Sequence, residues 1–127
     1  MSIIYLDQTL AQEIVNRTMK IIKRNINVMN EKGVIIGSGD KSRLDTIHEG
    51  ALKVIEYQSE FEISLQDSKN MQGVRPGVNL PINFNGKIVG VIGITGLPEE
   101  IRSFGELVKM AAEMILQQAV LIEEMQW

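Results

Sequence analysis

The pattern of apolar and polar residues changes period several times along the chain, and each change marks a predicted element. Apolar side chains at helical spacing predict a helix over residues 7–24, which Asp7, or Thr9 with Gln12, can cap. The basic side chains at the far end of this segment suit the negative end of a helix dipole. Residues 26–30 and 34–38 then read as two strands joined by a short polar turn, which predicts an antiparallel hairpin.

Helical spacing returns over residues 46–57, where Thr46 and Glu49 fit a capping box. This interpretation places His48 in the first turn of the helix. The alternation that follows, with apolar residues at 61, 63 and 65, predicts an edge strand.

The strongest hairpin signal of the chain is Asn85-Gly86, which joins an alternating segment over 78–84 to an apolar segment over 87–95. The second of these segments is apolar on both faces. It is therefore predicted to lie in the middle of a sheet that is covered on both sides.

A final helix is predicted from Pro98 onward, with Glu99 and Glu100 near the positive end of its dipole. Apolar residues then recur with a seven-residue period. The a positions are Ile101, Val108, Ile115 and Ile122, and the d positions are Phe104, Ala111, Gln118 and Met125. This period suits a parallel two-stranded coiled coil as well as a helix packed on its own sheet, and both interpretations stay open because further apolar residues broaden the face.

The order helix, two strands, helix, strand, hairpin, helix predicts an α+β domain of the PAS-like or GAF-like kind. We expect an antiparallel sheet of about five strands with helices at both termini, formed by residues 1–127 as a single domain.

Composition narrows the function mainly by exclusion. A net charge of −3 argues against a surface that binds nucleic acid or anionic lipid, and the absence of cysteine with one histidine argues against disulfides, a thiol nucleophile or a structural zinc site. The start of the chain lacks a secretion signal, and the longest apolar stretch is about half of what a membrane span requires. These features predict a cytoplasmic protein without a membrane partner.

The segment over residues 38–51 contains the parts of an anion pocket. It leaves a strand, turns at Gly39 and enters a helix whose free amides attract a carboxylate or a phosphate, and Arg43 and His48 add charged and polar donors. The alternative is that Arg43 pairs with a neighbouring acid and that His48 is satisfied by the backbone. A dinucleotide fingerprint is incomplete here, and the glycines of a nucleophile elbow are missing around Ser38.

Arg75 is a second candidate, in a Gly- and Pro-rich loop before a strand that begins near Asn79. An exposed loop arginine is usually only solvated. Two arginines from separate loops that converge on one pocket would instead match a ligand with a carboxylate at each end.

Several ordered blocks of sequence resemble the sugar diacid recognition domain of carbohydrate diacid regulators. In the first half these blocks are Asn25-Ile-Asn-Val-Met-Asn30, Gly33-Val-Ile-Ile-Gly-Ser-Gly39, Arg43 and His48-Glu-Gly-Ala51. In the second half they are Gly73-Val-Arg-Pro-Gly-Val-Asn-Leu-Pro-Ile82, Gly86-Lys-Ile-Val-Gly-Val-Ile-Gly-Ile-Thr-Gly96 and Leu107-Val-Lys-Met110. The resemblance covers nearly the whole chain.

The resemblance implies a ligand-sensing module for sugar diacids or related hydroxy acids, of the glucarate, galactarate or glycerate class. Such a module is normally followed by other regions and a DNA-binding helix-turn-helix, which this chain does not include. The matched blocks assign Arg43, His48, Arg75 and Asn79 to the pocket, and they imply neither a catalytic residue nor a metal or cofactor.

From these residues we expect Arg43, His48 and the helix start to hold one carboxylate, Arg75 to hold the other, and Asn79 with Ser38 to read hydroxyl groups. The terminal helices are expected to form a homodimer and to carry the signal. Two alternatives remain at this stage. One is a structural dimerisation domain with a vestigial pocket, and the other is a small enzyme that uses His48 as a base.

Overall fold

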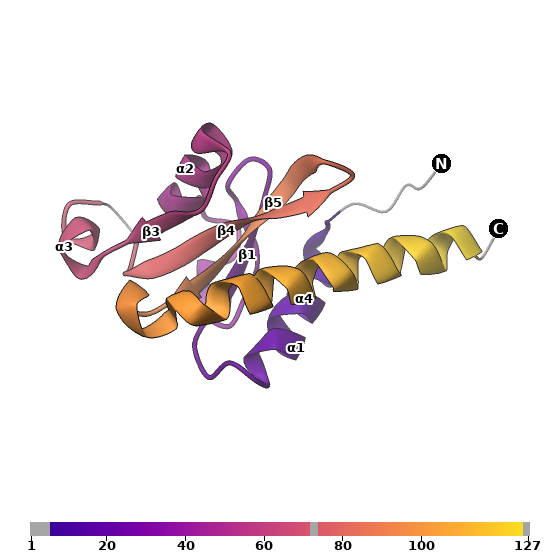
Figure 1. Ribbon diagram of the computed structural model, residues 1–127, viewed down its shortest axis with the longest axis horizontal. Helices are drawn as coiled ribbons and strands as arrows, with labels where there is room; N and C mark the ends of the chain where they lie inside the picture. Colours follow the sequence, from indigo (N-terminus) through magenta and orange to yellow (C-terminus); the bar gives the residue numbers. More distant parts are fainter. Residues whose placement is uncertain (1–5, 72–73, 126–127) are drawn as a thin grey trace.

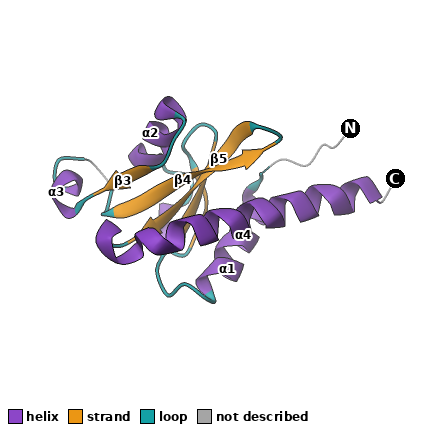
Figure 2. Ribbon diagram, viewed as in Figure 1, coloured by secondary structure: helices purple, strands orange, loops and turns teal. Residues whose placement is uncertain are grey.

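Five antiparallel strands form one sheet in the order β2-β1-β5-β4-β3. The computed structural model describes residues 6–71 and 74–125. Its elements, coloured in Figures 1 and 2, are α1 (Gln8–Met19), β1 (Ile26–Asn30), β2 (Ile35–Ser38), the 3₁₀ turn η1 (Lys41–Arg43), α2 (Glu49–Tyr57), β3 (Phe61–Ile63), α3 (Leu65–Ser68), β4 (Gly77–Phe84), β5 (Lys87–Thr95) and α4 (Pro98–Met125). The predicted α+β class and five-stranded antiparallel sheet are confirmed.

The sheet is covered on both faces, as the apolar segment over 87–95 predicts. Helices α1 and α4 pack on one face and α2 packs on the other (Figure 1). β5 is the central strand, and its side chains alternate between the two cores: Ile92 and Ile94 join the α1–α4 side, and Val91 joins the α2 side with Ala51 and Val54.

The first helix is shorter than the predicted segment over 7–24. It begins after Asp7, whose carboxylate accepts the amide hydrogen of Leu10, and it ends at Met19. The chain must leave the helix there because Asn25 already pairs with β5, its carbonyl accepting from the amide of Thr95. Four basic residues were expected at the helix end, namely Arg17, Lys20, Lys23 and Arg24, and of these only Arg17 lies in the last turn.

The strand predicted over 61–65 is also shorter, because a helix cap interrupts it. β3 ends at Ile63, and the hydroxyl of Ser64 accepts from the amide of Asp67 as the N-cap of α3. Leu65 therefore lies in a helix and not in the edge strand. This local hydrogen bond competes with strand pairing, as serine often does at an element boundary.

The long helix α4 packs on its own sheet through the first three predicted a positions. Ile101, Val108 and Ile115 are buried, whereas Ile122 and the d-position Met125 are exposed. The first part of the predicted seam is therefore occupied within the chain. Within residues 6–71 and 74–125, no helix combines the length and the apolar composition that a membrane span needs.

Gly37 lets α1 approach β2 closely, and replacing it is expected to destabilise the fold. A Cβ at Gly37 would lie 2.7 Å from the Ala11 carbonyl carbon, which is backbone and cannot rotate away. We expect Gly37→Ala to lower the unfolding free energy by about 1–3 kcal/mol in urea titrations. Gly105→Ala is the control, since the nearest atoms to its Cβ belong to the side chains of Leu80, at 3.1 Å, and Val78, at 3.6 Å, which shift more easily than backbone, and the substitution gains helix propensity. Equal stability of the two variants would contradict this account.

Candidate functional site

One row of residues crosses all five strands in register on the α2 side of the sheet. Ser38 pairs with Asn27, Asn27 with Gly93, Gly93 with Asn79, and Asn79 with Phe61. Directly paired residues point to the same face, so this row forms a floor. Neighbouring strands are about 4.8 Å apart, which puts roughly 14 Å between the backbones of Ser38 and Asn79.

Asn79 lies next to Phe61, which ends this floor, and it is bordered by the bare backbones of two glycines. It is buried, and its Nδ2 donates to the carbonyl of Phe61 at 3.2 Å. A Cβ at Gly93 of β5 would lie 2.6 Å from Asn79 Oδ1, and one at Gly50 of α2 would lie 2.8 Å from Asn79 Nδ2. The two glycines therefore provide the room that the Asn79 amide occupies.

His48 is the N-cap of α2 and not a residue of its first turn, so the expected Thr46–Glu49 capping box is wrong. Its Nδ1 accepts the amide hydrogen of Ala51 at 3.2 Å, and its own amide donates to the carbonyl of Gly33 at 2.8 Å. An accepting Nδ1 places the ring proton of neutral His48 on Nε2. The ring lies beside Asn79, because Gly50 borders both side chains.

Burial keeps His48 neutral at physiological pH. The residue is 6% exposed, and this desolvation, together with the positive charge of Arg43, lowers the pKa of His48 from 6.5 to about 4. His48 therefore acts near neutral pH as a hydrogen-bond donor through Nε2. A neutral donor suits recognition of a carboxylate or a hydroxyl.

Arg43 and Arg75 lie in the same corner, with Asp40 between their charges. Arg75 Nη2 is 3.9 Å from Asp40 Oδ2. Burial and the nearby charge of Arg75 lower the pKa of Arg43, and Asp40 opposes this effect. The pKa of Asp40 is lowered mainly by hydrogen bonds from the Ser42 hydroxyl and amide. The two guanidinium groups bring positive charge to this corner, and positive charge attracts an anion.

Ser38 lies at the far end of the floor and is committed to local hydrogen bonds. Its hydroxyl donates to Asn27 Oδ1 and accepts from the amide of Asp40. Asn25 Nδ2 also donates to Asn27 Oδ1, at 3.1 Å. These contacts fix the orientation of the Asn27 amide. Asn27 lies two strands away from Asn79, whereas Ser38 lies three strands away.

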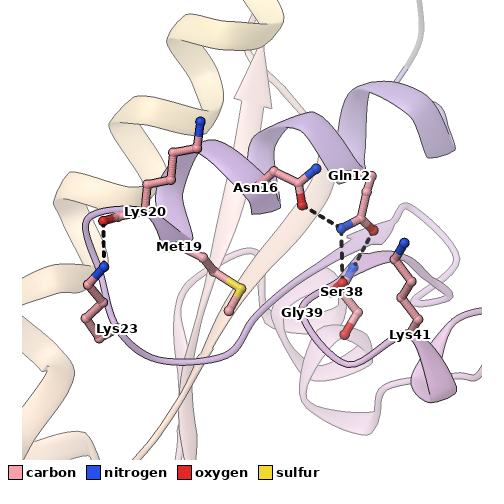
Figure 3. A pocket seen from close by; sticks show the side chains of 8 residues that line it. All are labelled: Gln12, Asn16, Met19, Lys20, Lys23, Ser38, Gly39 and Lys41. Carbon is pink, nitrogen blue, oxygen red and sulfur yellow. Dashed lines mark hydrogen bonds between the residues drawn. The ribbon is translucent and has the colours of Figure 1, made fainter.

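A separate cavity of about 430 Å³ lies between α1 and the segment after β2 (Figure 3). It is lined by Gln12, Asn16, Met19, Lys20, Lys23, Ser38, Gly39 and Lys41. The Gln12 amide holds the exposed edge of β2, donating to the Ser38 carbonyl and accepting from the Ser38 amide, both at 3.1 Å. Of the five predicted site residues, only Ser38 borders this cavity.

The sequence prediction therefore corresponds to one corner plus a more distant serine. Arg43, His48, Arg75 and Asn79 lie around the start of α2, and Ser38 lies at the opposite end of the floor. Sequence reasoning missed Asn27 as a floor residue. Its signal was an amide between two buried apolar residues of a strand, on the opposite face from these neighbours, Ile26 and Val28.

Comparison with solved structures finds the same fold in GAF domains. The GAF domain of an Acinetobacter phosphoenolpyruvate-protein phosphotransferase matches with a TM-score of 0.61, covering 91% of this chain and 84% of that one at 11% identity. The GAF domain of the nutrient sensor CodY from Clostridium difficile matches at 0.53, covering 84% and 81% at 11% identity. At these identities the likeness concerns the fold alone.

Sequence comparison gives a much closer relationship. The carbohydrate diacid regulator of Escherichia coli (strain K12) is 52% identical over 118 residues, which are 93% of this chain and 31% of that protein. An uncharacterized protein of Haemophilus influenzae is 44% identical, over 96% of this chain and 33% of its own length. The chain thus spans about a third of the length of the curated relatives that it matches. The family described as "Putative sugar diacid recognition" matches residues 6–127, and the chain belongs to this family.

Proposed function

We propose that this domain is the ligand-sensing module of a transcriptional regulator and that it binds sugar diacids or related hydroxy acids. The observation that carries the proposal is the corner formed by Arg43, His48, Arg75 and Asn79 in a member of the diacid recognition family. Glucarate, galactarate and glycerate represent the ligand class. Recognition is the proposed role, without catalysis.

The two carboxylates of a diacid are held by different groups in this proposal. Arg43, the Nε2–H of His48 and the start of α2 hold one carboxylate, where the half-buried guanidinium supplies most of the attraction. Arg75 holds the other. Its side chain is 57% exposed and only loosely paired with Asp40, so it is free to turn toward a ligand.

The hydroxyl groups of the ligand are read from the floor of the sheet. Asn79 provides an amide at the α2 end, and Ser38 contributes by orienting the Asn27 amide. Gly93 separates the two asparagines along the row, and the Asn79 amide lies over its bare backbone. Amides that both donate and accept suit hydroxyl groups, so these residues are proposed to select among acids.

The signal is proposed to leave through β3 and α4. The Phe61 carbonyl accepts from Asn79, and the next residue, Glu62, forms a bidentate pair with Arg102 of α4 at 2.6 and 2.8 Å. A ligand that moves Asn79 therefore shifts a strand that is tied to the long helix. We propose that α4 passes this shift through a homodimer, in the cytoplasm, to a DNA-binding region of the complete regulator.

A thermal-shift screen of hydroxy acids tests this function. A ligand at 100 times its Kd adds about 2.7 kcal/mol of stability, which is about 10 °C for a domain of this size. We expect such a rise with at least one of glucarate, galactarate or glycerate, and a smaller one with succinate, which lacks hydroxyls. A flat response to the whole panel would favour a structural domain with a vestigial pocket, and consumption of an acid would favour an enzyme.

A further inference from the structure

Helix α4 carries a second apolar row, which is exposed. Leu107, Met114 and Leu121 recur every seven residues and are 57%, 59% and 56% exposed. Met110 and Met125 extend the same side. With 3.6 residues per turn, this row lies roughly 120° around the helix from the buried row of Ile101, Val108 and Ile115.

Such a row is unusual on a helix that already has a sheet to pack against. Single exposed apolar residues are common on protein surfaces, but several large ones on one helix face mark an interaction site. A seven-residue repeat is the spacing with which one helix meets another in a coiled coil. A helix with a matching repeat therefore fits this face.

We propose that the row binds the same row of a second copy, with the two α4 helices parallel. This inference deepens the dimer of the proposed function and rests on it, but it does not depend on which acid is bound. Each copy exposes five large side chains of roughly 100 Å² each. Two copies therefore bury about 1,000 Å², the size of a small specific interface.

The residue pattern favours parallel pairing. In parallel helices each a residue meets its own counterpart, so Leu107, Met114 and Leu121 form three apolar layers. Here Leu107, Met114 and Leu121 are numbered as the a positions of their own repeat, so its d positions are Met110, Gln117 and Glu124. Antiparallel pairing would place Gln117 and Glu124 against apolar a residues, whereas parallel pairing sets each of them against its own counterpart and leaves the three a layers apolar.

The flanking charges agree with this arrangement. Glu106 and Glu113 precede the apolar row at g positions, and their parallel partners at the e positions five residues later are Ala111 and Gln118. No like charges face one another there. Glu113 is in addition neutralised within its own chain by Lys109, at 2.6 Å.

Sedimentation velocity of the 127-residue chain between 5 and about 200 μM tests the interface. We expect a dimer, and we expect Leu121→Lys to weaken association at least tenfold, since it places two like charges in one layer. Leu65→Lys is the matched control because Leu65 is 53% exposed but lies in α3. A wild-type monomer at the highest concentration, or a Leu121→Lys variant that associates like wild type, would overturn the proposal.

Cross-linking tests the direction of the helices, because the chain has no native cysteine. Parallel pairing predicts that Leu107→Cys and Leu121→Cys each form a disulfide with their own counterpart on mild oxidation. Cross-linking of Leu107→Cys only with Glu124→Cys, which pairs an a position with a d position, would show antiparallel helices and overturn the parallel arrangement. Leu121→Lys is also expected to keep any acid-dependent thermal shift, so loss of the dimer and loss of ligand binding are distinguishable.

Discussion

Acidification from pH 7.5 to pH 4 is expected to destabilise the domain by about 3 kcal/mol more than it destabilises a His48→Asn variant. His48 has a pKa of about 4 in the folded chain, whereas the unfolded chain has the ordinary value of 6.5. The unfolded state therefore binds a proton first as the pH falls. The stability that neutral His48 contributes is complete above pH 6.5 and is lost between pH 6.5 and 4.

The His48→Asn variant isolates this effect because asparagine is a good N-cap that does not titrate in this range. Hydrogen bonds from Ser42 and Arg102 lower the pKa values of Asp40 and Glu62. Protonation of these two carboxylates therefore also lowers the stability of the folded chain on acidification. They are present in both proteins and cancel in the comparison. Urea unfolding at several pH values measures the difference, and parallel pH profiles of the two proteins would show that His48 is not buried in its neutral form.

Replacing Arg43 is expected to weaken diacid binding far more than replacing Asn79. Charge-assisted hydrogen bonds contribute roughly 1.5–3 kcal/mol each and neutral ones about 0.5–1.5 kcal/mol. Arg43→Ala should therefore raise the Kd at least tenfold and up to about 150-fold, whereas Asn79→Ala should raise it by about tenfold at most. Isothermal titration calorimetry, with the acid that gives the largest thermal shift, measures both values.

Two further variants sharpen this comparison. Arg43→Lys keeps the charge but loses the planar fork, so it should recover only part of the affinity. Arg17→Ala removes an exposed arginine that pairs with Glu13 on α1, outside the corner, and it should bind like wild type. Small and equal effects of Arg43→Ala and Asn79→Ala on the Kd would contradict the proposal that Arg43 binds a carboxylate of the ligand. Thermal melts of each variant confirm that the protein is folded.

Local chemistry explains most of what could be predicted from the sequence. Asn85 and Gly86 both adopt positive φ and close the predicted hairpin, because short polar residues and glycine tolerate that backbone. The errors lie at element ends. His48 caps α2 in place of the expected Thr46, and Ser64 caps α3 where a strand was expected to continue. Several neighbouring polar side chains could have made each capping hydrogen bond, so the sequence did not indicate which one does.

The grouping of the site residues could be predicted only in part. The resemblance to the family named Arg43, His48, Arg75 and Asn79, but the neutral state of His48 depends on burial by segments distant in sequence. Asn27 was missed because a polar residue in a strand is informative only when its register partners are known.

The sequence by itself determined the types of the longer elements, the central position of β5 and the presence of seven-residue apolar spacing in α4, because periodicity and turn chemistry act over a few residues. Only the tertiary structure decided which apolar row of α4 faces the sheet, and that Ser38, Asn27, Gly93 and Asn79 form one floor. The physical reason is that strand register and helix rotation are set by packing between distant segments. A one-residue change in register would turn the asparagines of the floor to the opposite face.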